Sequence, residues 1–152
     1  MGVTTEVRAT DAAKWRTGVT VVRAEAQRAA KQGTGGTGRT TVVDYAGTGG
    51  ERTWIGTVTL PPGTRTGTHH HGRHEVTIFI VKGRLEIRWG ERLEYVADLE
   101  PGDFAYFAPF VPHQEFNTHT VDTVDLIAIR SDNERIAIPL ADNPVDRPEA
   151  VY

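Results

Sequence analysis

Short apolar segments separated by turn residues dominate the chain from residue 40 onward. Most of them are rich in Val, Ile, Thr, Phe or Trp, the residue types that favour β-strands. The segments expected to be strands are 40–45, 53–60, 75–81, 85–89, 92–99, 104–108, 113–118, 121–130 and 135–139. Strands this short and this evenly spaced, with almost no helix between them, predict an all-β sandwich or barrel.

Two turn signals and one two-faced strand refine this prediction. Lys82-Gly83-Arg84 predicts a short hairpin loop between its flanking strands. In Pro101-Gly102-Asp103, proline presets φ and glycine stands where a tight turn requires a positive φ. The strand 75–81 is apolar on both faces, which suits a closed barrel with something packed outside it. A second subunit is the favoured cover, and strand 40–45 or the N-terminal arm is the alternative.

The two ends of the chain follow a different pattern. An apolar run at 19–22 precedes a segment of good helix formers at 24–31, and the glycine-rich run GTGGTG at 33–38 then predicts a flexible linker. A phosphate-binding loop is not expected there, because no strand enters it and the Lys-Ser/Thr pair is absent. The last residues are polar and contain prolines, which is typical of a loosely held tail. The expected division is an arm with linker (1–39), a barrel (40–140) and a tail (141–152).

Composition excludes several classes of partner and site. With 17 basic against 20 acidic residues, the net charge of −3 gives no reason to expect nucleic acid binding. The absence of cysteine excludes disulfides and thiolate metal sites. The N-terminus lacks the apolar core of a secretory signal, and no apolar run is long enough to span a bilayer. We therefore expect a cytoplasmic protein without a membrane partner.

Histidines supply the candidate chemistry. Four of the six occur in HHHGRHE, which begins at His69. Because side chains alternate along a strand, His69 and His71 share one face. Glu75 reaches the same face if the chain turns tightly at Gly72, and His113, stiffened by prolines on both sides, is the natural third imidazole. Three neutral imidazoles and a carboxylate suit Fe²⁺, Mn²⁺, Co²⁺, Ni²⁺ or Zn²⁺ and leave positions open for substrate.

The first histidine segment resembles the first motif of the cupin superfamily. Gly63 is followed by five residues, His-x-His, three residues and Glu75, as in that motif. Gly83 follows one residue later than the usual pattern.

The second cupin motif is matched by Gly102, His113 and Asn117 at the family's offsets. Ala108 and Phe110 stand where that pattern usually has Pro and Gly. The resemblance covers roughly residues 40–140. It implies a double-stranded β-helix (jelly-roll) barrel, with an N-terminal arm containing a short helix, and one divalent metal ion, Fe²⁺ favoured. The implied ligands are His69, His71, Glu75 and His113.

Residues around the expected site were assigned by the same alternation. If His113 points into the barrel, Glu115 and Asn117 share its face. Glu115 is the catalytic candidate, as a general base or as a partner that orients a histidine, unless a bulge after position 112 turns it to solvent. Asn117 is expected to secure its turn, and His70 and His74 are expected at the surface.

Several functions remain compatible with this resemblance, since cupin folds serve enzymes and binding modules alike. We expect a metal-dependent enzyme acting on a small organic molecule, with oxygen-dependent chemistry favoured over a lyase, isomerase or polyketide-cyclase reaction. The alternative is a non-catalytic module that binds a metal or small ligand. A homodimer is the expected assembly.

Overall fold

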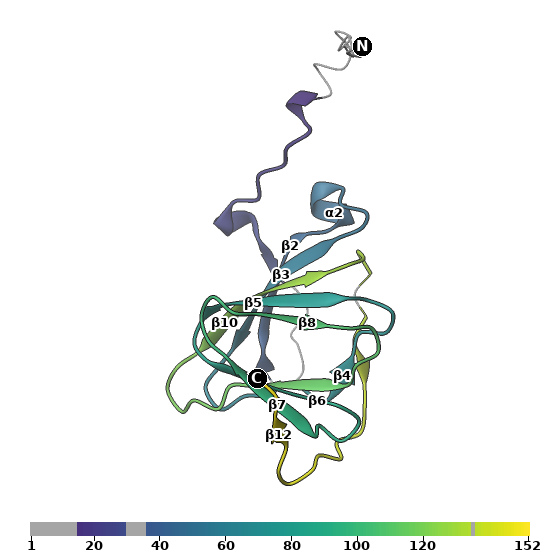
Figure 1. The fold of residues 1–152 in the computed structure, drawn as a ribbon. Coiled ribbons are helices and arrows are strands. Elements are labelled where there is room, and N and C mark those ends of the chain that lie inside the picture. The colour runs from purple at the N-terminus through teal and green to yellow at the C-terminus, as the bar shows by residue number, and fades with distance from the viewer. Residues whose placement is uncertain (1–14, 30–35, 135) are drawn as a thin grey trace, which may run out of the picture.

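The computed structural model describes residues 15–29, 36–134 and 136–152, and two six-stranded sheets form its body (Figure 1). Sheet A contains, in spatial order, β1 (Arg28–Ala29), β2 (Gly38–Val43), β3 (Trp54–Leu60), β10 (Val124–Arg130), β5 (Val76–Lys82) and β8 (Phe104–Phe107). Sheet B contains β11 (Ile138–Pro139), β4 (His69–His70), β9 (His113–Phe116), β6 (Leu85–Trp89), β7 (Tyr95–Leu99) and β12 (Glu149–Ala150). Two short helical turns, η1 (Ala24–Ala26) and α2 (Tyr45–Thr48), precede β1 and β3.

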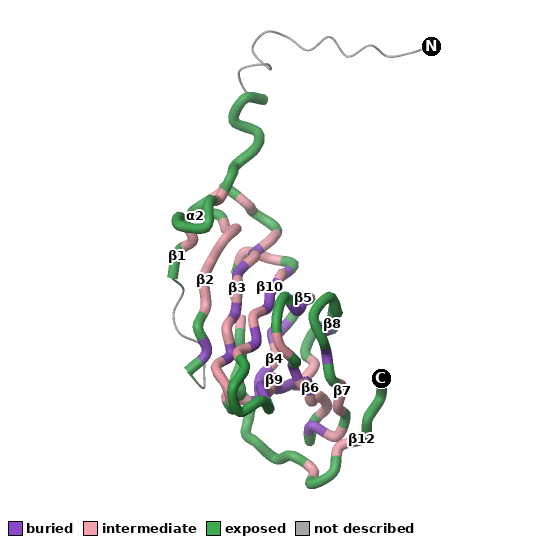
Figure 2. The backbone as a smooth tube through the Cα atoms, turned by 90° about the vertical axis from the view of Figure 1, so that its left-hand side faces the viewer, coloured by how far each residue is buried: buried purple, intermediate pink, exposed green. Residues whose placement is uncertain are grey.

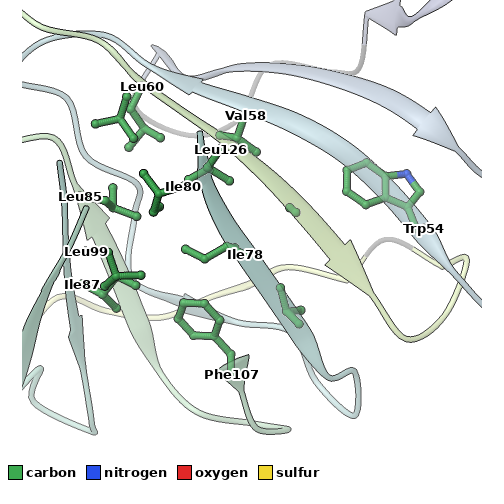
Figure 3. Packing of buried hydrophobic residues seen from close by; sticks show 13 residues of the cluster. Trp54, Val58, Leu60, Ile78, Ile80, Leu85, Ile87, Leu99, Phe107 and Leu126 are labelled. Carbon is green, nitrogen blue, oxygen red and sulfur yellow. The ribbon is translucent and has the colours of Figure 1, made fainter. Parts of the chain in front are cut away.

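Alternating side chains of the two sheets build the core between them. Every second residue is buried throughout β3 and β10 and in β5 up to Ile80, as the period of two requires (Figure 2). Ile78 and Ile80 of β5 lie opposite Leu85, Ile87 and Leu99 of sheet B (Figure 3). Most strand positions expected from the sequence therefore exist, with ends that shift by a few residues.

Three expectations about connections and ends are wrong. The residues 82–84 do not form a hairpin loop, because β5 belongs to sheet A and β6 to sheet B, so the chain crosses between sheets there. The helix expected at 24–31 is only a 3₁₀ turn, and β1 follows it at Arg28 and pairs with β2. The C-terminal segment is not a loose tail, since β12 pairs in parallel with β7. In each case pairing with a distant strand, which local sequence does not reveal, decides the outcome.

Other local predictions are confirmed. The backbone N–H of Asp103 bonds to the carbonyl of Glu100 at 3.0 Å, and Gly102 has φ +98°, as expected for the Pro-Gly turn. Asn117 is 1% exposed, and its amide donates to the carbonyls of Leu60, Pro61 and Asp122. Half of the glycine run expected to be a linker, residues 33–35, lies outside the described residues, and Gly38 already begins β2.

The outer face of sheet A has no cover among the described residues. Strand β2 extends the sheet beside β3 instead of lying over β5. Residues 15–27 project away from the body and are largely exposed (Figures 1 and 2). Neither alternative cover expected within the chain is therefore present in the described structure.

Candidate metal centre

Three histidines from sheet B meet inside the barrel. His69 of β4 lies directly opposite His113 of β9 in the strand register, and His71 follows β4 by one residue. The ring centroids are 4.4 Å apart for His69 and His113, 4.9 Å for His69 and His71, and 5.0 Å for His71 and His113. One nitrogen from each ring lies within 4.8 Å of the others, and all three residues are buried. Three imidazoles at this spacing could hold a single metal ion.

Backbone carbonyls fix the orientation of all three rings. Nδ1 lies 2.7 Å from the Gly67 oxygen in His69, 2.8 Å from the Ile136 oxygen in His71 and 2.9 Å from the Val111 oxygen in His113. A carbonyl only accepts, so each Nδ1 must carry the proton and donate it. Each Nε2 is thereby left with a free lone pair, which is the state that binds a metal.

The chemistry of this donor set fits a divalent transition metal. Nε2 of His113 is buried and has no hydrogen-bond partner within the described residues. Burial lowers the pKa of His71 from 6.5 to about 3, with a further contribution from the neighbouring His113. Burial likewise lowers the pKa of His113 from 6.5 to about 4. Both rings are therefore neutral at physiological pH, as coordination requires.

Glu75 is not part of this group. It is exposed on the outer face of sheet A, where its carboxylate accepts a 2.6 Å hydrogen bond from the hydroxyl of Tyr106. This hydrogen bond raises the pKa of Tyr106. Gly72 does make the expected tight turn, with φ +57°, but the strand that follows turns position 76, and not 75, inward. The expected fourth ligand is thus absent from the site that the structure describes.

The sequence contained a signal for this difference. Counting back from Gly83 by the six-residue gap usual in the family reaches Val76 instead of Glu75. Val76 is 3% exposed and faces the interior between Arg130 and Phe107 of the neighbouring strands. An apolar side chain therefore stands where that count would place a carboxylate.

The surface positions expected for His70 and His74 need correction. His74 is 1% exposed, and neither of its ring nitrogens has a hydrogen-bond partner in the described chain. It shares the inward parity of Val76, yet it lies outside the three-histidine group. His70 is half-buried, and its Nδ1 accepts the backbone N–H of Gly72 at 2.9 Å. His119, by contrast, is exposed beside Asp122.

Glu115 faces the interior, as alternation from His113 predicts. Its backbone N–H donates to the hydroxyl of Thr66 at 3.0 Å, which fixes the strand at this point. Burial would raise the pKa of Glu115, but the nearby site histidines and Arg39 outweigh burial and lower it. The carboxylate is therefore ionised beside the three imidazoles without belonging to the group that could bind the metal.

Arg39 is a site residue that the sequence reasoning missed. It lies in β2 opposite Val58, whose side chain is 7% exposed and points inward, so Arg39 faces the interior too. Its charge contributes to lowering the pKa of Glu115. Alternation extended back by one residue from the expected strand 40–45 includes Arg39, whereas the glycine-rich run predicts a linker up to this position.

A cavity of about 630 Å³ opens beside the histidine group, between β6 and β7 on one side and β8 on the other. Its wall includes the apolar side chains of Ile87, Trp89, Leu99 and Phe107. The ring of Phe107 lies 4.3 Å from that of His113. In the strand register, Trp89 pairs with His113 and Ile87 pairs with Glu115, so the cavity wall continues into the site.

Comparisons with known proteins agree with this fold. The family model described as "Cupin domain" matches residues 56–130. The polyketide cyclase RemF from Streptomyces resistomycificus aligns with a TM-score of 0.68 at 17% identity, covering 83% of this chain and 89% of that one. A cupin 2 domain-containing protein from Halorhodospira halophila aligns with a TM-score of 0.57 at 27% identity, covering 73% and 69%. The expected double-stranded β-helix is therefore confirmed.

A third structural match is a deletion mutant of the Bacillus subtilis oxalate decarboxylase OxdC, with a TM-score of 0.64 and 16% identity. The alignment covers 80% of this chain and 33% of that one. No curated protein matches the chain. Among the described residues, no helix is both long and apolar enough to cross a membrane.

Proposed function

Because the chain belongs to the cupin superfamily and directs three neutral imidazoles at one point, we propose that it is a metal-dependent enzyme acting on a small organic molecule. The reaction class we favour is proton transfer, as in a lyase, isomerase or cyclase. One observation carries this preference: an ionised Glu115 lies beside the histidines, whereas no carboxylate of the described chain belongs to their group.

Three histidine ligands with an open position are one of the arrangements found in catalytic zinc sites. A bound divalent ion would supply Lewis acidity, polarising a substrate oxygen or lowering the pKa of bound water. The two-histidine, one-carboxylate set is the one typical of non-haem iron oxygenases. Since Glu75 lies on the outer face, the three-histidine donor set lacks the carboxylate of that pattern. This weakens the preference for oxygen-dependent chemistry that the sequence suggested.

Glu115 would serve as the general base. A carboxylate that is ionised at neutral pH can accept a proton from a bound substrate and return it to another carbon or oxygen. The cavity volume of about 630 Å³ is within the usual range for small-molecule sites.

Oxygen-dependent chemistry is the second candidate, because three imidazoles with open positions also suit Fe²⁺. Two structural neighbours bear the names of a cyclase and a decarboxylase, which keeps ring closure and decarboxylation among the reactions to test. Oxygen consumption by the iron-loaded protein with a substrate of the panel below would favour the oxygenase.

The first experiment is metal analysis of protein purified without added ions, followed by a test of proton exchange. A panel of small carbonyl compounds and organic acids is incubated with metal-loaded protein in deuterated water, and deuterium uptake at carbon is followed by NMR. We expect the Glu115→Gln variant to retain the metal and lose exchange. Glu75→Gln is the matched control, since it makes the same change on the outer face and should retain both.

Exchange that persists in Glu115→Gln would remove this residue from the proposed mechanism. A protein that binds its metal but exchanges no proton and consumes no oxygen with any compound would favour the binding module instead. Protein without stoichiometric metal in either variant would contradict the proposal as a whole.

A further inference from the structure

Arg39 extends into the barrel, and no carboxylate of the described residues forms an ion pair with it. Nε of this guanidinium is buried and has no hydrogen-bond partner among the described residues. Glu115 lies near enough to influence it electrostatically, yet no ion pair within 4.0 Å joins the two in the described chain. A buried guanidinium donor that is left unpaired is unfavourable, because it has lost water and gained nothing in return.

A second guanidinium also lies in the interior. Arg130 is 2% exposed, lies between Trp54 and Val76 in the register and stacks over the Trp54 ring at 4.9 Å. Its charge also disfavours protonation of His71 and thereby contributes to that residue's lowered pKa. The interior beside the neutral imidazoles therefore holds a second guanidinium, and a divalent ion would add further positive charge.

We propose that the small molecule bound in this site carries a carboxylate, and that Arg39 binds this group by charge-assisted hydrogen bonds. The inference deepens the proposed function by naming the substrate class. It stands on the charge and orientation of Arg39, so the anion site can be tested without the metal. Arginine suits this role because its planar fork matches the two oxygens of a carboxylate.

Benzoate and its neutral isostere benzamide are the probes, because they have the same aromatic body and differ only in the charged group that Arg39 would bind. Calorimetric titration of metal-free and zinc-loaded protein should show tighter binding of benzoate than of benzamide. The Arg39→Gln variant should weaken benzoate binding about ten-fold or more and leave benzamide unchanged. Arg28→Gln is the matched control, because Arg28 is exposed and pairs with Asp44 on the surface.

A second variant keeps the test decisive if Arg39→Gln fails to fold, as judged by circular dichroism. Arg39→Lys retains the charge but loses the fork, so partial loss of benzoate binding is expected. Glu115→Gln removes the carboxylate that competes for Arg39 and should tighten benzoate binding.

Equal binding of the two probes, or full benzoate affinity in both Arg39 variants, would overturn the proposal. Failure of the proposed enzyme is seen separately, in metal content and deuterium exchange. If benzoate binding depends on Arg39 but the protein holds no metal and exchanges no deuterium, the anion site is supported and only the proposed catalysis is contradicted.

Discussion

The two segments that carry the site histidines depart from their family pattern in opposite ways. The segment before β5 has the expected residue types but one residue too many before Gly83. The segment before β9 has the expected spacing but replaces the usual glycine with Phe110. The first change turns Glu75 to the outer face, whereas the second leaves His113 in the site. Spacing therefore matters more than residue type here, because one extra residue reverses which face a strand side chain occupies.

Loss of a site histidine should have the largest effect. In His113→Ala the pair formed by His69 and His71 remains, and metal affinity should fall by about 100-fold or more, since even partners that only orient ligands are worth 10–100-fold. Titration with Zn²⁺ or Fe²⁺ in a competing chelator measures this. His119→Ala is the control, because that exposed histidine lies outside the group, and it should bind the metal as the parent does.

Restoring the missing carboxylate should reverse the effect of the extra residue. Val76→Glu introduces a carboxylate at a buried inward position, so the metal-free variant should be less stable by about 2 kcal/mol or more. Metal should recover more stability in this variant than in the parent, because a fourth ligand becomes available. Denaturant unfolding with and without metal measures both changes. A metal-dependent gain equal to that of the parent would mean that position 76 does not reach the ion.

Acid should destabilise the metal-free protein through the site histidines. The unfolded chain takes up protons near the ordinary histidine pKa of 6.5, whereas folded His71 and His113 resist protonation down to about 3 and about 4. Stability therefore falls as the pH drops below about 6.5 and continues to fall toward about 4. Thermal unfolding of metal-free protein across this range tests the prediction. His71→Gln should flatten the dependence, and an unchanged slope in that variant would contradict it.

The smallest effect is expected at the substituted glycine position. Phe110 has φ +64°, a left-handed conformation that is unfavourable for a bulky residue, and its backbone N–H bonds to the Gly72 carbonyl at 2.8 Å. Phe110→Gly should stabilise the protein by about 0.5 kcal/mol, since relief of strain exceeds the greater entropy of glycine in the unfolded chain. Metal affinity should not change. A loss of stability would show that the contact of Phe110 with His70 outweighs the strain.

The local elements followed closely from the sequence. The alternation of apolar residues predicted the positions of the main strands and placed Glu115 on the same inner face as His113. The Pro-Gly turn at 101–103 forms as its residue types predict. The segments that failed were those held by distant partners. β1 pairs with β2, and β12 with β7, so neither the expected helix nor the loose tail was correct.

By itself, the sequence determined the β-strand class, the cupin pattern and the three histidines that converge. It did so because side-chain alternation and ligand spacing are local properties of the chain. Only the tertiary structure decided that Glu75 leaves the site, that His74 is buried and that Arg39 enters from a strand in the opposite sheet. These outcomes depend on which strands pair and in which register, and that choice is made by packing between segments far apart in the chain.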